Sequence, residues 1–173
     1  GAVYVTGSTN SPNFPTTPGA SDATCDSCGD NLPGDAYVLK LTSSGTVVYS
    51  TLIGLSDYES GYSIAVDELG QAYVGGGNAG GFCNCFPTVN GLQSFKSSYY
   101  DTFLSKLSAS GGALLYSTLL GGNNDEYGIE DVVSIGGGRV YLTGLSRSTN
   151  LPITAGAHDA SCGTTSSPHS GTF

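Results

Sequence analysis

The sequence lacks methionine and tryptophan and is poor in charge. Charged residues make up 11% of the chain, against about 25% in an ordinary soluble protein. The net charge is −9, and the few basic residues are never adjacent: Lys40, Lys96, Lys106, Arg139 and Arg147. Binding to phosphates needs clustered cations, so we expect no nucleic-acid partner. No apolar run approaches the roughly 20 residues of a membrane span, so we expect no membrane-spanning segment.

Helix-favouring composition is also missing. The chain has 27 glycines among 173 residues, 11 tyrosines against 6 phenylalanines, and abundant serine and threonine. Glycine and β-branched residues are weak helix formers but suit short strands and tight turns. The composition therefore predicts an all-β protein. No signal peptide is present, and because the chain begins abruptly on a strand-like segment, we expect that the start of a secreted precursor is missing.

The sequence repeats itself. Tyr4, Tyr73 and Tyr141 occupy equivalent places in similar segments, with spacings of 69 and 68 residues. Four blocks recur in one order: 1–7 with 70–76 and 138–144, 13–20 with 85–92 and 150–157, 35–45 with 101–111, and 47–54 with 114–121. A repeat of this length indicates a tandem architecture whose units bury a shared core.

Each block has strand character, with apolar and aromatic residues in partial alternation. Glycine-containing hairpin turns are predicted at 43–45, 67–71 and 109–112. The central unit predicts four strands, at 62–68, 71–76, 101–107 and 113–121, with a long loop carrying Phe-Pro-Thr between the two hairpins. Four sequential antiparallel strands per repeat is the pattern of a β-propeller blade. We therefore predict blades in tandem, about two and a half repeats: a partial first blade over 1–61, a second over 62–121 and a partial third over 122–173.

These blocks resemble the bacterial beta-propeller repeat (SBBP) family over essentially the whole chain. The family's units carry Tyr-Val-Thr-Gly, Phe-Pro-Thr-Thr with Gly-Ala, Asp-Ala-Phe-Val-Lys-Leu, Tyr-Ser-Thr-Leu-Gly-Gly and Ile-Ala-Val-Asp with a glycine turn. The chain departs from this pattern in its longer, cysteine-containing loops, in the sequence at 129–138, and in stopping where a further Asp-Ala-Phe strand is due. The resemblance implies the fold and an extracellular setting, and we expect a protein that is secreted or held at the cell surface. It implies no activity, because members share no established catalytic residues.

The incomplete set of blades has a consequence for partners. Propellers usually close with four to eight blades, so this chain is not expected to close a ring by itself. Repeat units need neighbours to bury both faces. We expect either that further repeats of a longer chain cover the open blades or that identical subunits assemble into a homo-oligomer or filament.

Five cysteines lie in the long loops: Cys25, Cys28, Cys83, Cys85 and Cys162. Four thiols from neighbouring loops would suffice for a zinc site, but no ligand histidine follows them. In an extracellular protein disulfides are the default. Pairing is either local, within the Cys-x2-Cys and Cys-x-Cys motifs, or crossed between adjacent blades. Cys162 then has its partner outside this chain or is free.

Two acidic turns, at 55–61 and 121–128, offer the hard oxygen ligands that calcium prefers. Their candidate ligands are Asp57, Glu59, Asn123, Asp125 and Glu126. Asp and Asn also favour turns through side-chain hydrogen bonds to the backbone, and this is the preferred interpretation. We expect no cofactor, with calcium as the one candidate.

Five tyrosines recur at strand positions: Tyr4, Tyr49, Tyr73, Tyr116 and Tyr141. Regular recurrence favours packing between blades over a sugar-stacking surface.

No Gly-x-Ser-x-Gly motif occurs, and His158 and His169 lie in a segment rich in Ser, Gly and Pro, so an enzyme is not expected. The sequence predicts a non-catalytic extracellular scaffold, a cell-surface or filament-forming component that assembles through exposed blade edges. The alternative is a glycan- or protein-binding propeller module of a larger secreted protein.

Overall fold

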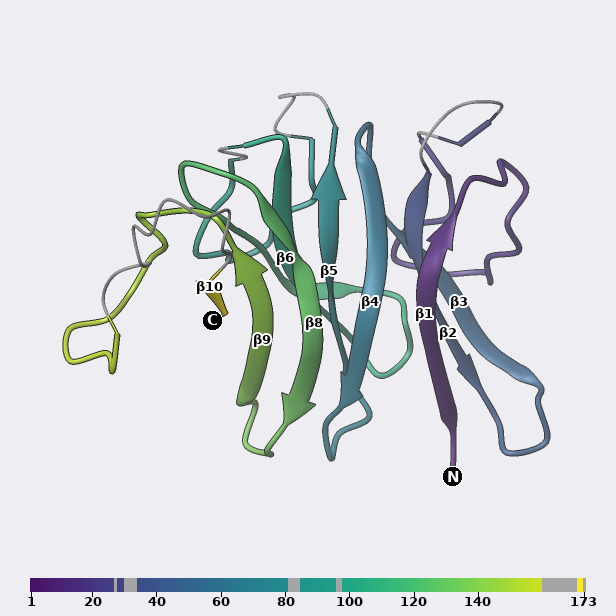
Figure 1. Cartoon of the computed structure of the whole chain (residues 1–173). Helices are drawn as coiled ribbons and strands as arrows, with labels where there is room; N and C mark the ends of the chain where they lie inside the picture. Colours follow the sequence, from purple (N-terminus) through teal and green to yellow (C-terminus); the bar gives the residue numbers. More distant parts are fainter. Residues whose placement is uncertain (27, 30–33, 81–84, 96–97, 160–170, 173) are drawn as a thin grey trace.

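The computed structural model describes residues 1–26, 28–29, 34–80, 85–95, 98–159 and 171–172. These residues form ten strands in three antiparallel sheets that stand side by side (Figure 1). The first sheet has the order β1-β2-β3, the second β4-β5-β6-β7 and the third β10-β9-β8. The all-β prediction of tandem propeller-type blades that do not close a ring is confirmed. The described residues form no helix, and so none long and apolar enough to pass through a bilayer.

The second sheet is a complete four-stranded blade. It consists of β4 (Tyr58–Val66), β5 (Ala72–Ala79), β6 (Tyr100–Leu107) and β7 (Leu114–Leu120). Three of these strands, β5, β6 and β7, begin within two residues of their predicted starts, but β4 begins four residues earlier than predicted. Its extra residues pair with the end of β5, where Tyr58 lies opposite Ala79. Both hairpin turns contain a glycine with positive φ, Gly70 at 75° and Gly111 at 73°.

The first and third sheets are parts of the same unit. The first contains β1 (Val3–Thr9), β2 (Asp35–Leu41) and β3 (Val47–Ile53), which match β5, β6 and β7 in sequence and pairing order. The third contains β8 (Glu126–Ser134), β9 (Val140–Ser146) and β10 (Gly171–Thr172), which match β4, β5 and the start of β6. Thus the sheet pairing divides the chain into parts of three equivalent blades.

The core fills the two junctions between sheets. Between the first and second sheets the buried side chains are Ala36, Val38, Tyr49 and Ile53 on one side and Val74, Phe86, Phe103, Leu107 and Leu119 on the other. Between the second and third they are Tyr73, Leu104, Ile129 and Val132. Val74 faces the first sheet and the adjacent Tyr73 the third, as expected from alternation along a strand. Each face of the second sheet is therefore covered by a neighbouring sheet.

The long loops cover the outer edges of the first two sheets. In the first, Thr17 N donates to Ser50 O over 3.0 Å and Leu52 N to Asp22 O over 3.0 Å, along the free side of β3. In the second, Val89 and Ser117 exchange two backbone hydrogen bonds on the free side of β7. Uncovered strand edges invite pairing with another chain. These loops block such pairing at β3 and β7.

Candidate functional sites at the junctions between sheets

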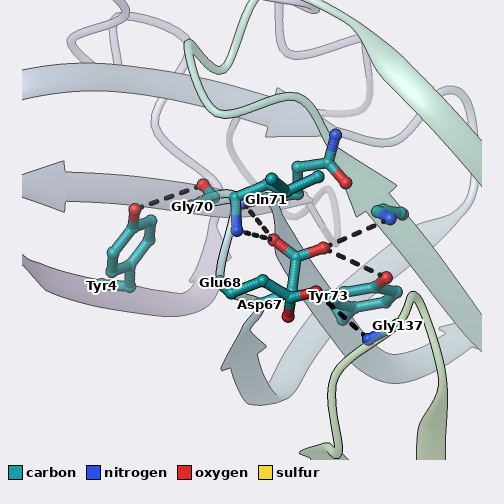
Figure 2. Close-up of polar contacts among 9 residues, drawn as sticks. Tyr4, Asp67, Glu68, Gly70, Gln71, Tyr73 and Gly137 are labelled. Carbon is teal, nitrogen blue, oxygen red and sulfur yellow. Dashed lines mark hydrogen bonds and ion pairs between the residues drawn. The ribbon is translucent and has the colours of Figure 1, made fainter.

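The turn between β4 and β5 is organised by Asp67. Its Oδ1 accepts hydrogen bonds from Leu69 N over 3.0 Å and Gln71 N over 2.9 Å. Its Oδ2 lies 3.4 Å from Lys106 Nζ and 3.4 Å from the Tyr73 hydroxyl (Figure 2). Burial acts to raise the pKa of Asp67, but the hydrogen bonds from Gln71 and Leu69 and the contact with Lys106 outweigh it and leave the pKa lowered. Asp67 is therefore held ionised within the turn.

This turn joins all three sheets. The Tyr4 hydroxyl, from β1, donates to Gly70 O over 3.3 Å. On the other side Gly137 N, from the turn between β8 and β9, donates to Glu68 Oε1 over 3.1 Å (Figure 2). A further link comes from Lys40 Nζ, which donates to Ala109 O over 3.3 Å and lies 5.2 Å from the centre of the Tyr4 ring. Polar contacts therefore fix the stacking of the sheets at this end.

A pair of buried carboxyl groups lies at the other end of the first junction. Asp35 begins β2, Glu59 lies on β4, and both side chains are fully buried. They meet over Gly54, where an added Cβ would lie 2.6 Å from Asp35 Cγ and 2.7 Å from Glu59 Oε2. Glycine is required at position 54 because the carboxyl groups fill the space a side chain would need.

The electrostatics of this pair centre on Glu59. Burial, followed by the charges of Asp35 and Asp57, raises the pKa of Glu59 to about 8, while a hydrogen bond from Asn78 acts in the opposite direction. That bond runs from Asn78 Nδ2 to Glu59 Oε1 over 2.6 Å. Among the described residues, Glu59 Oε2 and Asn78 Oδ1 have no hydrogen-bond partner. At neutral pH Glu59 is therefore mainly protonated.

The second junction repeats the arrangement with different partners. Asp101 and Glu126 are buried on either side of Gly121, where an added Cβ would lie 2.6 Å from Asp101 Oδ1 and 2.9 Å from Glu126 Oε2. Here Glu126 accepts hydrogen bonds from the hydroxyls of Ser146 and Ser148. Burial raises the pKa of Glu126, and these two serines act to lower it. A Gly–Asp–Glu set is thus common to both junctions.

The predicted calcium ligands lie partly inside the two junctions and partly outside them. Asp57, Glu59 and Glu126 are buried in the junctions. Asn123 is exposed and caps the segment after β9 by accepting from Thr149 N over 3.0 Å, and Asp125 Oδ1 accepts from Tyr100 N over 3.3 Å. No group of three or more His, Cys, Asp or Glu side chains in the described ranges has the geometry to hold a metal ion. Calcium binding stays a prediction.

Two of the predicted cysteine positions form a local disulfide. Cys25 and Cys28 are bonded, with their Cα atoms 5.3 Å apart. Cys85 is also disulfide-bonded. The two other cysteines, Cys83 and Cys162, lie outside the described residues.

The repeated tyrosines take two environments. Tyr49 and Tyr73 are buried in the junctions, and Tyr4 and Tyr116 pack against the same clusters. Tyr141 differs, since 66% of its surface is exposed. Its neighbours Val140 and Leu142 pack toward the second sheet, so Tyr141 points to the other side of the third sheet.

Sequence reasoning missed the aspartate of each carboxyl pair. Asp35 is the first residue of β2 and Asp101 the second residue of the equivalent strand β6, and that recurrence was a visible signal. Their pairing with a glutamate of the next blade depends on how the sheets stack. It also missed a second set of tyrosines at one end of the second junction, of which only Tyr58 and Tyr127 lie one repeat spacing (69 residues) apart: Tyr58, Tyr62, Tyr99, Tyr100 and Tyr127.

The fold and the junctions define a protein of tandem β-propeller-type blades. A scan against protein-family models finds no match for the chain, and a search of curated proteins finds none either. Membership of the bacterial beta-propeller repeat family stays a hypothesis that rests on the sequence blocks.

Proposed function

We propose that this chain is a non-catalytic extracellular structural repeat protein whose blades stack into a stiff scaffold at a cell surface or in a filament. The observation that carries the proposal is that the same two faces of the blade are used at both junctions. The disulfide between Cys25 and Cys28 supports an extracellular setting, because disulfides persist in oxidising compartments.

The outer faces of the first and third sheets match the faces that are buried inside. In the second sheet Phe86 and Phe103 pack with ring centres 4.9 Å apart and are buried. Their counterparts in the first sheet, Phe14 and Tyr37, pack with ring centres 5.0 Å apart but are only half-buried. On the third sheet Tyr141 is exposed where its counterpart in the second sheet is buried. Each outer face therefore has the side chains of a blade junction without the covering sheet among the described residues.

These faces, rather than the outer edges, are the proposed contact surfaces, because the long loops already occupy the free sides of β3 and β7. The outer face of the first sheet in one copy would contact the outer face of the third sheet in another copy. These two faces correspond to the two sides of a junction inside the chain. Contacts of this kind are heterologous and extend along an axis or close into a ring. Further blades of the same chain would use the same surfaces.

The test is light scattering coupled to size exclusion over a range of protein concentrations. We expect the chain to form species larger than the 17.5 kDa monomer. Tyr141→Asp places a charge on the outer face of the third sheet and should restore the monomer. Leu92→Asp, at an exposed loop residue, is the matched control and should leave assembly unchanged. A chain that stays monomeric at all concentrations refutes self-assembly.

A further inference from the structure

Five tyrosines gather where the second and third sheets meet, at the end opposite the Asp67 turn. They come from β4, from β8, from the start of β6 and from the residue just before it, and four of them expose 40% or more of their surface: Tyr62, Tyr99, Tyr100 and Tyr127. The fifth, Tyr58, is half-buried. Tyrosine rings on an ordinary surface occur singly. A group of exposed rings therefore needs an explanation other than core packing.

Four of these rings line a pocket of about 90 Å³. They are Tyr58, Tyr62, Tyr100 and Tyr127, and the rest of the lining consists of Gly77, Ala79, Glu126 and Gly128. Glycines make room for the Tyr62 ring. A Cβ on Gly77 would lie 3.2 Å from the Tyr62 ring, and a Cβ on Gly128, where φ is 96°, would overlap it. The Tyr62 ring therefore packs directly against the backbone at these two glycines.

The rings are held in place before any ligand arrives. Tyr99 and Tyr100 pack edge to face with ring centres 4.8 Å apart, and Tyr100 stacks with Tyr127 at 6.1 Å. Tyr100 N donates to Asp125 Oδ1, which fixes the start of β6. The guanidinium of Arg147 lies 4.9 Å from the centre of the Tyr127 ring. Rigid aromatic groups lose little conformational entropy on binding, so this arrangement suits recognition.

The charges around the pocket select the class of ligand. Aromatic pockets commonly bind organic cations, but here Arg147 already lies over Tyr127 and repels a second cation. Glu126 offers little attraction, because its carboxyl group is buried and accepts from two serine hydroxyls and from Gly122 N. In the part of the chain that the structure describes, no cluster of basic residues is available to bind an anion here. A neutral ligand with both an apolar face and hydroxyl groups remains.

We propose that this tyrosine cluster is a carbohydrate-binding site, in which the apolar face of a pyranose ring packs against the exposed parts of the Tyr62, Tyr100 and Tyr127 rings and its hydroxyls bond to tyrosine hydroxyls. Tyrosine combines an apolar ring with a polar group, as stacking on a sugar requires. The pocket is small and holds one side of one sugar ring, so neighbouring sugars of a chain extend over the exposed Tyr99. The site is independent of the outer faces through which blades are proposed to stack.

The experiment is calorimetric titration of the full chain with cellohexaose, chitohexaose and mannohexaose at millimolar concentrations. We expect at least one of the three to bind. Tyr62→Ala and Tyr127→Ala should each weaken that binding about three- to tenfold. Tyr62→Phe keeps the ring and should lose less than Tyr62→Ala, which separates stacking from a folding defect. Circular dichroism spectra of all variants provide the check on folding.

The matched control is Leu69→Ala, which removes an exposed side chain from the Asp67 turn at the opposite end of the second sheet and should leave the affinity unchanged. The proposal is overturned if none of the three oligosaccharides binds, or if Leu69→Ala weakens binding as much as the pocket variants do. Titration with choline chloride tests whether the pocket binds an organic cation. If choline binds and none of the three oligosaccharides does, the proposal is also overturned. The carbohydrate test and the self-assembly test are independent. Absence of carbohydrate binding would not refute self-assembly, and a monomeric chain would not refute carbohydrate binding.

Discussion

Replacing Glu59 with glutamine is expected to change how the stability of this protein depends on pH. The carboxyl group is fully buried beside Asp35, and its pKa is raised from 4.5 to about 8. Between these two values the folded state holds a proton that the unfolded state has released. The free energy of unfolding therefore falls as pH rises across this window, which is the direction for an acid with a raised pKa.

The size of the effect follows from the two pKa values. Each pH unit within the window corresponds to about 1.4 kcal/mol, so raising pH from about 5 to about 7 costs roughly 2 to 3 kcal/mol of stability through Glu59. Glu59→Gln removes this titration. The glutamine Oε1 still accepts from Asn78 Nδ2, and its Nε2 donates toward the carboxyl group of Asp35. The variant should match the wild type near pH 5 and exceed its stability at pH 8.

The assay is urea unfolding followed by far-ultraviolet circular dichroism at several pH values between these limits, with the disulfides intact. Glu68→Gln is the control, because Glu68 is an exposed carboxylate and glutamine retains the acceptor for Gly137 N. Equal slopes of stability against pH in the wild type and Glu59→Gln would refute the reasoning. So would an equal change of slope in Glu68→Gln.

Two further predictions concern the junctions. Phe86→Ala should lower the free energy of unfolding by about 3 to 5 kcal/mol, and Phe14→Ala, at its half-buried counterpart in the first sheet, should lower it by clearly less. Urea unfolding at neutral pH measures both variants. Equal losses of stability would contradict the assignment of the outer face of the first sheet as uncovered. Asp67→Asn should destabilise the protein at neutral pH by weakening the contact with Lys106. Because the pKa of Asp67 is lowered in the folded state, the difference in free energy of unfolding between the variant and the wild type should shrink as pH falls below about 4. A difference that persists unchanged at pH 3 would show that the charge of Asp67 does not matter.

Much of the secondary structure could be predicted because it depends on local sequence. Hairpin turns at 43–45, 67–71 and 109–112 depend on glycines that adopt positive φ, and Gly45, Gly70 and Gly111 do so. The internal repeats then showed which strands of the three sheets are equivalent. The start of β4 at Tyr58 was missed, because the segment from Asp57 to Ser60 has turn-forming composition and becomes a strand only by pairing with β5.

The candidate sites were harder to predict, since their members come from different blades. Asp35 and Glu59 are 24 positions apart in the sequence and meet only where two sheets stack. The calcium hypothesis selected Glu59 and Glu126 from the acidic turns but not the aspartates that face them. Tyr62, Tyr100 and Tyr127 share no repeat position, so no period in the sequence joins them.

Alternation, turn residues and a 68- to 69-residue period are properties of the chain, and they sufficed to predict the strands apart from the start of β4, the order of the strands within each blade and the repetition of the blade. Which tyrosines are buried and which are exposed depended on how the sheets stack. Tyr73 and Tyr141 lie in similar segments of the repeat, yet one is 3% and the other 66% exposed. The reason is physical: burial depends on whether another sheet covers that face, and this is set by contacts distant in sequence.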